Sequence, residues 1–234
     1  MGKSSIYNQL FGGLNMKGGA KMGNLIKLMY EKKEFLNLVF ANLIAQLGIT
    51  YYVMERTSAQ QNNLNISIWS LFLAQLIIIF VMALVPIPES IKFLLFCFFS
   101  YTFGLMLSVL KNKYSSDIIN VAIQGALTVF AFMLATGVAL FAGGINLGYK
   151  FGSILFWSLL ALIVARLVLV LGAKMNQAYK ILSFIGIILF AIYVLYDTNK
   201  ILQRDYYGDV ITASMDYYLD ILNLFTNFIG SNNN

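Results

Sequence analysis

The stretch VITASMDYYLDILNLFTNFI, residues 210–229, decides the fold of this chain. Within it, Asp216, Asp220, Asn223 and Asn227 are spaced at i, i+4, i+7 and i+11, so a helix places all four on one face. The opposite face carries Ile, Leu, Phe and Tyr. A helix with a continuous polar stripe is poorly suited to lipid, so we expect the other helices of the chain to surround it.

The composition excludes a soluble or a disordered protein. Of 234 residues, 59% are hydrophobic and 11% are charged, and the mean hydropathy is +0.76, whereas soluble domains carry about 25% charged residues. The chain has no histidine and one cysteine, Cys97. These counts exclude a Ser-His-Asp triad, a His-ligated haem, nearly every catalytic zinc site and an intrachain disulfide. We therefore expect no cofactor.

Seven apolar runs predict the architecture. A membrane-spanning helix needs about 20 apolar residues, and the runs are 34–54, 66–85, 91–110, 118–141, 152–171, 181–196 and 210–229. The connections between them are short, so neighbouring helices should be antiparallel. The prediction is an all-α membrane protein, a seven-transmembrane-helix bundle with the C-terminal helix at its centre. Residues 34–230 form this domain, between a polar basic arm (1–33) and a polar tail (231–234).

Basic residues indicate the orientation of the bundle. The net charge is +6, and Lys and Arg concentrate in the arm and in alternate connections, which favours a cytoplasmic N-terminus. Membrane orientation explains this charge better than nucleic acid does. For the arm itself two interpretations remain open: a helix resting on an anionic leaflet, or a solvated leader.

Ionisable groups remain inside the apolar runs, where they are costly and usually functional. Asp197 lies at the membrane edge, in FAIYVLYDTNKIL (190–202), a short link away from the stripe that holds Asp220. If the two meet, they share one proton. The alternatives are a water-exposed cap at Asp197 and a structural carboxyl at Asp220. Arg166 is either a counter-charge to the acids or a cation that extends outward to the membrane surface.

Two motifs resemble those of a known family. YDTNKI (196–201) and YYLDILNLF (217–225) are similar to the C-terminal signature of the transmembrane Bax inhibitor motif proteins, which include Bax inhibitor one, the lifeguard and Golgi anti-apoptotic proteins and bacterial homologues. The resemblance covers roughly residues 34–230. It implies a seven-helix bundle with a central last helix, calcium leak, pH sensing and suppression of cell death. It also implies that Asp197 and Asp220 are the proton-sharing sensor and transient ligands of Ca²⁺.

The chain departs from the family pattern in two places. Asp216 stands where the family usually has Ser or Asn, and this third carboxylate would either strengthen cation attraction or raise the set-point of the pair. Bacterial relatives use basic residues near the end of the second helix to latch the aspartates, and this chain offers only Lys92 there. We therefore expect a leak more open than a latched one. Accessory roles are assigned to Asp216, Asn223, Asn227, Arg166 and Lys92.

These observations lead to a functional hypothesis with two rivals. The first is an integral, multi-pass membrane protein that leaks cations, calcium above all, in a pH-sensitive manner and suppresses cell death. Its compartment would be the endoplasmic reticulum, Golgi or plasma membrane in a eukaryotic or viral setting, or the inner membrane of a bacterium. The second is a non-conducting protein that regulates cell-death or store-release membrane partners. An intramembrane aspartyl protease is the third, but Tyr206 replaces the first glycine expected before Gly208-Asp209, so we expect no enzyme.

Overall fold

The computed structural model describes residues 18–59, 68–171, 176–204 and 208–232, and within these ranges it is helical without any strand. Each of the seven predicted apolar runs contains a helix, and an eighth helix precedes them; residues 66 and 67 of the second run lie outside the described ranges. The helices are α2 (Gly18–Glu31), α3 (Lys33–Ala59), α4 (Ile68–Leu84), α5 (Glu89–Lys113), α6 (Ser116–Ala142), α7 (Tyr149–Leu171), α8 (Asn176–Arg204) and α9 (Val210–Ser231).

Five of these helices, α3, α5, α6, α7 and α8, are long and apolar enough to cross a membrane. The predicted number of seven crossings is thus shown only in part. Helix α4 is apolar but has only 17 residues, and α9 is not among the five because its polar stripe lowers its hydropathy. Large apolar side chains remain exposed on the outer helices, such as Ile154 and Trp157 of α7, as expected for surfaces that face lipid.

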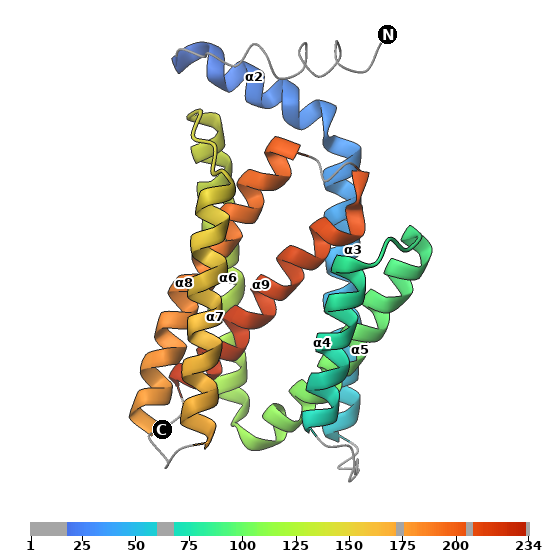
Figure 1. Cartoon of the computed structure of the whole chain (residues 1–234), viewed down its shortest axis with the longest axis vertical. Coiled ribbons are helices and arrows are strands. Elements are labelled where there is room, and N and C mark those ends of the chain that lie inside the picture. The colour runs from blue at the N-terminus through green and yellow to red at the C-terminus, as the bar shows by residue number, and fades with distance from the viewer. Residues whose placement is uncertain (1–17, 60–67, 172–175, 205–207, 233–234) are drawn as a thin grey trace.

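Helix α9 runs diagonally between two groups of helices (Figure 1). One group is α3, α4 and α5, and the other is α6, α7 and α8. Within the described part of the chain, no helix of one group packs extensively on a helix of the other, whereas α9 packs on α3, α5, α6 and α8. More than half of the residues of α9 are buried, among them Tyr217, Tyr218 and Asn227. The helix with the polar stripe therefore joins the two halves of the bundle.

Small residues allow the helices around α9 to approach closely. A Cβ atom added at Gly186 of α8 would overlap the side chain of Asn227, and one at Gly137 of α6 would lie 2.8 Å from the Cβ of Thr198. In a membrane, helices associate through close packing and hydrogen bonds rather than through the hydrophobic effect. These glycines therefore bring α8 close to both α6 and α9.

The described part of the N-terminal arm, α2, lies across one end of the bundle (Figure 1). Between α2 and α3, Lys32 donates hydrogen bonds from Nζ to the carbonyl oxygens of Ile201 (3.3 Å) and Leu202 (2.9 Å). A cation near the C-terminus of a helix satisfies free carbonyls and complements the helix dipole. This contact attaches the arm to the end of α8; residues 1–17 of the arm lie outside the described ranges.

Candidate functional site

The two acids singled out in the sequence lie together at the interface of α8 and α9. Asp197 is 6% exposed and Asp220 is 3% exposed, and their carboxyl groups are close enough to interact electrostatically with each other. Two ionised carboxylates have no donor between them, so a hydrogen bond between them would require a proton on one of the two. Among the described residues, no partner reaches Asp220 Oδ2, which is also buried. The shared proton between them stays a prediction.

Lys200 links this pair to Asp216. Its Nζ atom lies 3.0 Å from Asp216 Oδ2 and 3.8 Å from Asp197 Oδ1. The side chains of Lys200 and Asp216 are 32% and 26% exposed, against 8% for that of Asp197. The cluster therefore runs from a partly exposed ion pair to a buried acid pair.

Sequence reasoning did not assign Lys200 to this site. Its position three residues after Asp197, which places the two on one face of α8, was a usable signal.

The two residues between Asp197 and Lys200 hold neighbouring segments in place. The hydroxyl of Tyr217 in α9 donates to Thr198 Oγ1 at 3.0 Å. The fully buried Asn199 accepts from the backbone N–H of Leu147 and donates to the carbonyl of Ile145, both at 2.8 Å. The sequence Asp197-Thr198-Asn199-Lys200 thus fixes α9 and the α6–α7 turn around the acid pair.

Lys92 lies on a different acid. Its Nζ atom is 2.5 Å from Asp209 Oδ2, and Asp209 also caps α9 by accepting from the backbone N–H of Thr212 at 2.9 Å. Burial raises the pKa of Asp209, but hydrogen bonds from Lys92 and Thr212 outweigh this effect and hold the pKa below its ordinary value. Lys92 therefore does not contact the pair of Asp197 and Asp220. Its ionic partner is Asp209.

The polar stripe of α9 divides into an acidic half and an amide half. Arg166 of α7 donates from Nη2 to Asn227 Oδ1, and its guanidinium also lies 6.0 Å from the ring centre of Tyr179. Asn227 and Asn223 donate to the backbone carbonyls one turn earlier in α9. None of the described ion pairs includes Arg166, so its contact is with an amide and not with the acids.

A second buried polar network joins α9 to α3 and α5. Thr50 Oγ1 lies 2.5 Å from the hydroxyl of Tyr218 and 3.1 Å from the carbonyl oxygen of Ser100, whose own hydroxyl donates to Gln46 Oε1 at 2.8 Å. Asn42 Nδ2 lies 2.5 Å from Ser214 Oγ. Sequence reasoning missed this network.

A signal for the second network was present in the sequence. Asn42, Gln46 and Thr50 recur every four residues, as the acids of α9 do. The recurrence places them on one face of α3, as the structure shows.

The acidic cluster does not have the geometry of a resident metal site. In the described ranges, no group of three or more Asp, Glu, His or Cys side chains is placed to hold a metal ion. Ca²⁺ at Asp197 and Asp220 therefore stays a prediction about an ion in passage.

Comparisons with known proteins relate the chain to one family and to several relatives. The sequence profile of the family described as inhibitor of apoptosis-promoting Bax1 matches residues 32–230. Protein LIFEGUARD 1 of Arabidopsis thaliana is 29% identical over 134 residues, which are 56% of this chain and 54% of the relative. The BI1-like protein of the same plant is 28% identical over 128 residues, 54% of this chain and 47% of the relative.

A bacterial relative matches over a longer range. An uncharacterized protein of Campylobacter jejuni is 26% identical over 202 residues, 84% of this chain and 85% of the relative. By contrast, the chain spans about half the length of the plant relatives.

Proposed function

The chain belongs to the family of inhibitors of apoptosis-promoting Bax1, and from this premise we propose that it is a pH-sensitive leak for cations, calcium among them. As an integral, multi-pass membrane protein, it would affect calcium homeostasis and so suppress cell death. The burial of the carboxyl groups of Asp197 and Asp220 within electrostatic reach of each other is the observation that carries this proposal.

The acid pair works as the gate. With one proton between them, Asp197 and Asp220 hold α8 against α9 through their hydrogen bond. When the proton leaves, two negative charges face each other in a medium of low dielectric constant and repel. The same two carboxylates then offer hard oxygen ligands to a divalent cation. Because these ligands are few, the ion is held weakly enough to leave again.

Cations enter from the end of the bundle where Lys200 and Asp216 are partly exposed. Lys32 attaches the N-terminal arm to this end through the carbonyls of Ile201 and Leu202. The positive residues gathered there support a cytoplasmic N-terminus. In this topology α4 and α9 cross the membrane together with the five longer and more apolar helices.

Flux measurements on vesicles test the proposal. The purified chain is reconstituted in phosphatidylcholine vesicles that contain a calcium indicator, and calcium entry is recorded at a series of pH values. We expect entry to rise with pH. Asp220→Asn removes the titrating group but keeps the hydrogen bond, so entry should be low at every pH. Asp117→Asn, a change at an exposed acid of α6, is the matched control and should behave as the unmodified chain does.

The alternative is a non-conducting protein that acts on cell-death partners. The description of the family, which refers to apoptosis-promoting Bax1, favours it. If vesicles containing the chain take up calcium no faster than empty vesicles, the leak proposal fails. If cells expressing Asp220→Asn nevertheless survive a death stimulus as well as cells expressing the unmodified chain, partner binding explains the protection.

A further inference from the structure

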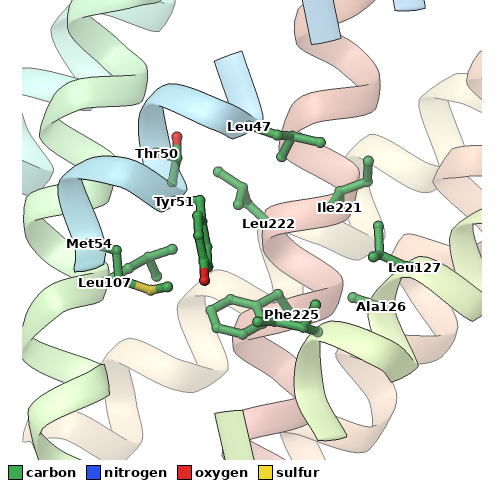
Figure 2. Close-up of a pocket in the computed structure, with 11 residues that line it drawn as sticks. Leu47, Thr50, Tyr51, Met54, Leu107, Ala126, Leu127, Ile221, Leu222 and Phe225 are labelled. Atoms are coloured by element: carbon green, nitrogen blue, oxygen red, sulfur yellow. The ribbon is translucent and has the colours of Figure 1, made fainter. Parts of the chain in front are cut away.

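An apolar crevice opens in the side of the bundle, with the central helix as its floor (Figure 2). Its volume is about 170 Å³, and its lining comes from α3, α5, α6 and α9. Among the described residues that line it, Thr50 and Tyr51 carry the hydroxyl groups, and the hydroxyl of Thr50 is engaged by the hydroxyl of Tyr218 and the carbonyl of Ser100. The crevice therefore offers a hydrocarbon surface to whatever enters it.

The mouth of the crevice lies in a surface that faces lipid. Tyr51 of α3 and Leu127 of α6 line the crevice and are 56% and 47% exposed. Ile44 and Val121 on the same two helices are also exposed, and both helices are long and apolar enough to cross the membrane. The apolar outer surface of the bundle thus continues into the crevice.

The floor of the crevice belongs to the most buried helix of the protein. Ile221, Leu222 and Phe225 of α9 line it and are each at most 5% exposed. Helices α3 and α6 both pack on α9 but make little direct contact with each other in the described ranges. The crevice is therefore the gap between the two halves of the bundle, with α9 at its base.

We propose that this crevice binds one hydrocarbon chain of a membrane lipid. An empty gap of this kind loses the dispersion contacts of its walls, and it does not suit water, which needs about two to four polar partners, because the lining offers little beyond the hydroxyl of Tyr51. An apolar cavity of about 150 Å³ holds benzene, so this crevice accommodates a short segment of an acyl chain. It is too narrow for a helix, whose diameter with side chains is about 10 Å. The bound chain packs on α9 and supports the junction of the two halves.

Photolabelling of the full chain tests this site. The protein is reconstituted in phosphatidylcholine vesicles that contain a trace of phosphatidylcholine with an aryl diazirine in its acyl chain. After illumination, mass spectrometry locates the labelled side chains. We expect label on Ile221, Leu222 and Phe225. We expect none on Leu224, which is equally buried in α9 but lies outside the crevice and so sets the background.

Variants at the crevice separate binding from general exposure to lipid. Ala126→Phe fills the crevice and should reduce the label on Ile221, Leu222 and Phe225 to the Leu224 background. Ala126 is fully buried, so Ala126→Phe could reduce the label by disturbing the core. Leu127→Trp blocks the exposed mouth of the crevice instead, and a loss of label in this variant cannot be attributed to a misfolded core. Val121→Trp, on the exposed surface of α6 outside the crevice, is the matched control and should leave the label unchanged.

Two results would overturn the proposal. The first is label on the exposed residues of α7, such as Ile154 and Trp157, with none above background on the floor of the crevice. A segment of protein that covers the crevice would produce this result. The second is undiminished label on the floor in both obstructed variants. Neither result depends on whether the chain conducts calcium.

Discussion

The ion pair of Lys92 and Asp209 should stabilise the protein by joining the start of α5 to the start of α9. Lys92 Nζ lies 2.5 Å from Asp209 Oδ2, and the side chains of Lys92 and Asp209 are 17% and 23% exposed. A hydrogen bond to a charged group contributes about 1.5–3 kcal/mol when buried, and an exposed ion pair about 0.2–1 kcal/mol. For a pair that is mostly buried, we expect a coupling free energy of about 1–2 kcal/mol between these limits.

A double-mutant cycle with Lys92→Met and Asp209→Asn measures this coupling. Asn is as good a helix cap as Asp, so Asp209→Asn removes the charge and leaves the cap of α9. Asp209→Ala removes both, and it should cost about 1 kcal/mol more than Asp209→Asn. The free energy of unfolding is measured in mixed detergent micelles by circular dichroism. A coupling near zero, or equal stability of the Asn and Ala variants, would refute this account of the start of α9.

The same contact has a defined pH dependence. The folded-state pKa of Asp209 is held below its ordinary value by Lys92 and Thr212, and an unfolded Asp has a pKa of about 3.9. The stabilisation is therefore present in full above the unfolded pKa and is lost as the pH falls through the folded pKa. The stability difference between the unmodified chain and Asp209→Asn should be constant at neutral pH and should shrink under acid conditions. A difference that grows as the pH falls would contradict the assignment.

Three further predictions concern the interfaces around α9 and the leak. Gly137→Ala should destabilise the bundle by about 1–3 kcal/mol because the added methyl group meets α8. Gly48→Ala, at a position that faces open space, should not destabilise it. Equal effects of the two variants on thermal unfolding would contradict this packing. Tyr218→Phe removes the hydrogen bond to Thr50 and should cost about 0.6–1.7 kcal/mol, read from the same unfolding measurements; an unchanged stability would mean that the bond contributes nothing. Lys200→Met removes the cation that favours ionised carboxylates, so the midpoint of the pH-dependent flux should move to higher pH; a move to lower pH would exclude Lys200 from the gate.

Most of the fold could be predicted because a long apolar run in a membrane has few alternatives to a helix. The central position of α9 followed from the four-residue spacing of Asp216 and Asp220, which leaves no wholly apolar surface for lipid. The extent of α8 could not be predicted in this way. Its apolar run was placed at 181–196, whereas the helix continues to Arg204. Hydropathy reports where a helix meets lipid, and the last turns of α8 meet polar side chains instead.

The proximity of the two acids could be predicted, but the long-range contacts around them could not. The proximity of Asp197 and Asp220 can be inferred locally, because only a short link separates α8 from α9. The contact of Lys92 with Asp209 joins residues 117 positions apart, and the contact of Asn199 with the α6–α7 turn joins residues more than 50 apart. Such contacts depend on which helices pack against each other, and the sequence pattern does not determine that arrangement. The stripe of Asn42, Gln46 and Thr50 is different, because its spacing was open to the same reasoning as that of α9.

Infrared spectroscopy of the purified protein tests most directly whether Asp197 and Asp220 hold one proton between them. A protonated buried carboxyl gives a carbonyl stretching band distinct from that of a carboxylate, and the band is followed while the pH is raised. We expect a protonated carboxyl band at neutral pH that disappears in a single titration and is absent in the variant with both Asp197→Asn and Asp220→Asn. If the unmodified chain shows no protonated carboxyl at neutral pH, or if the double variant keeps the band, the two acids do not form the proposed gate.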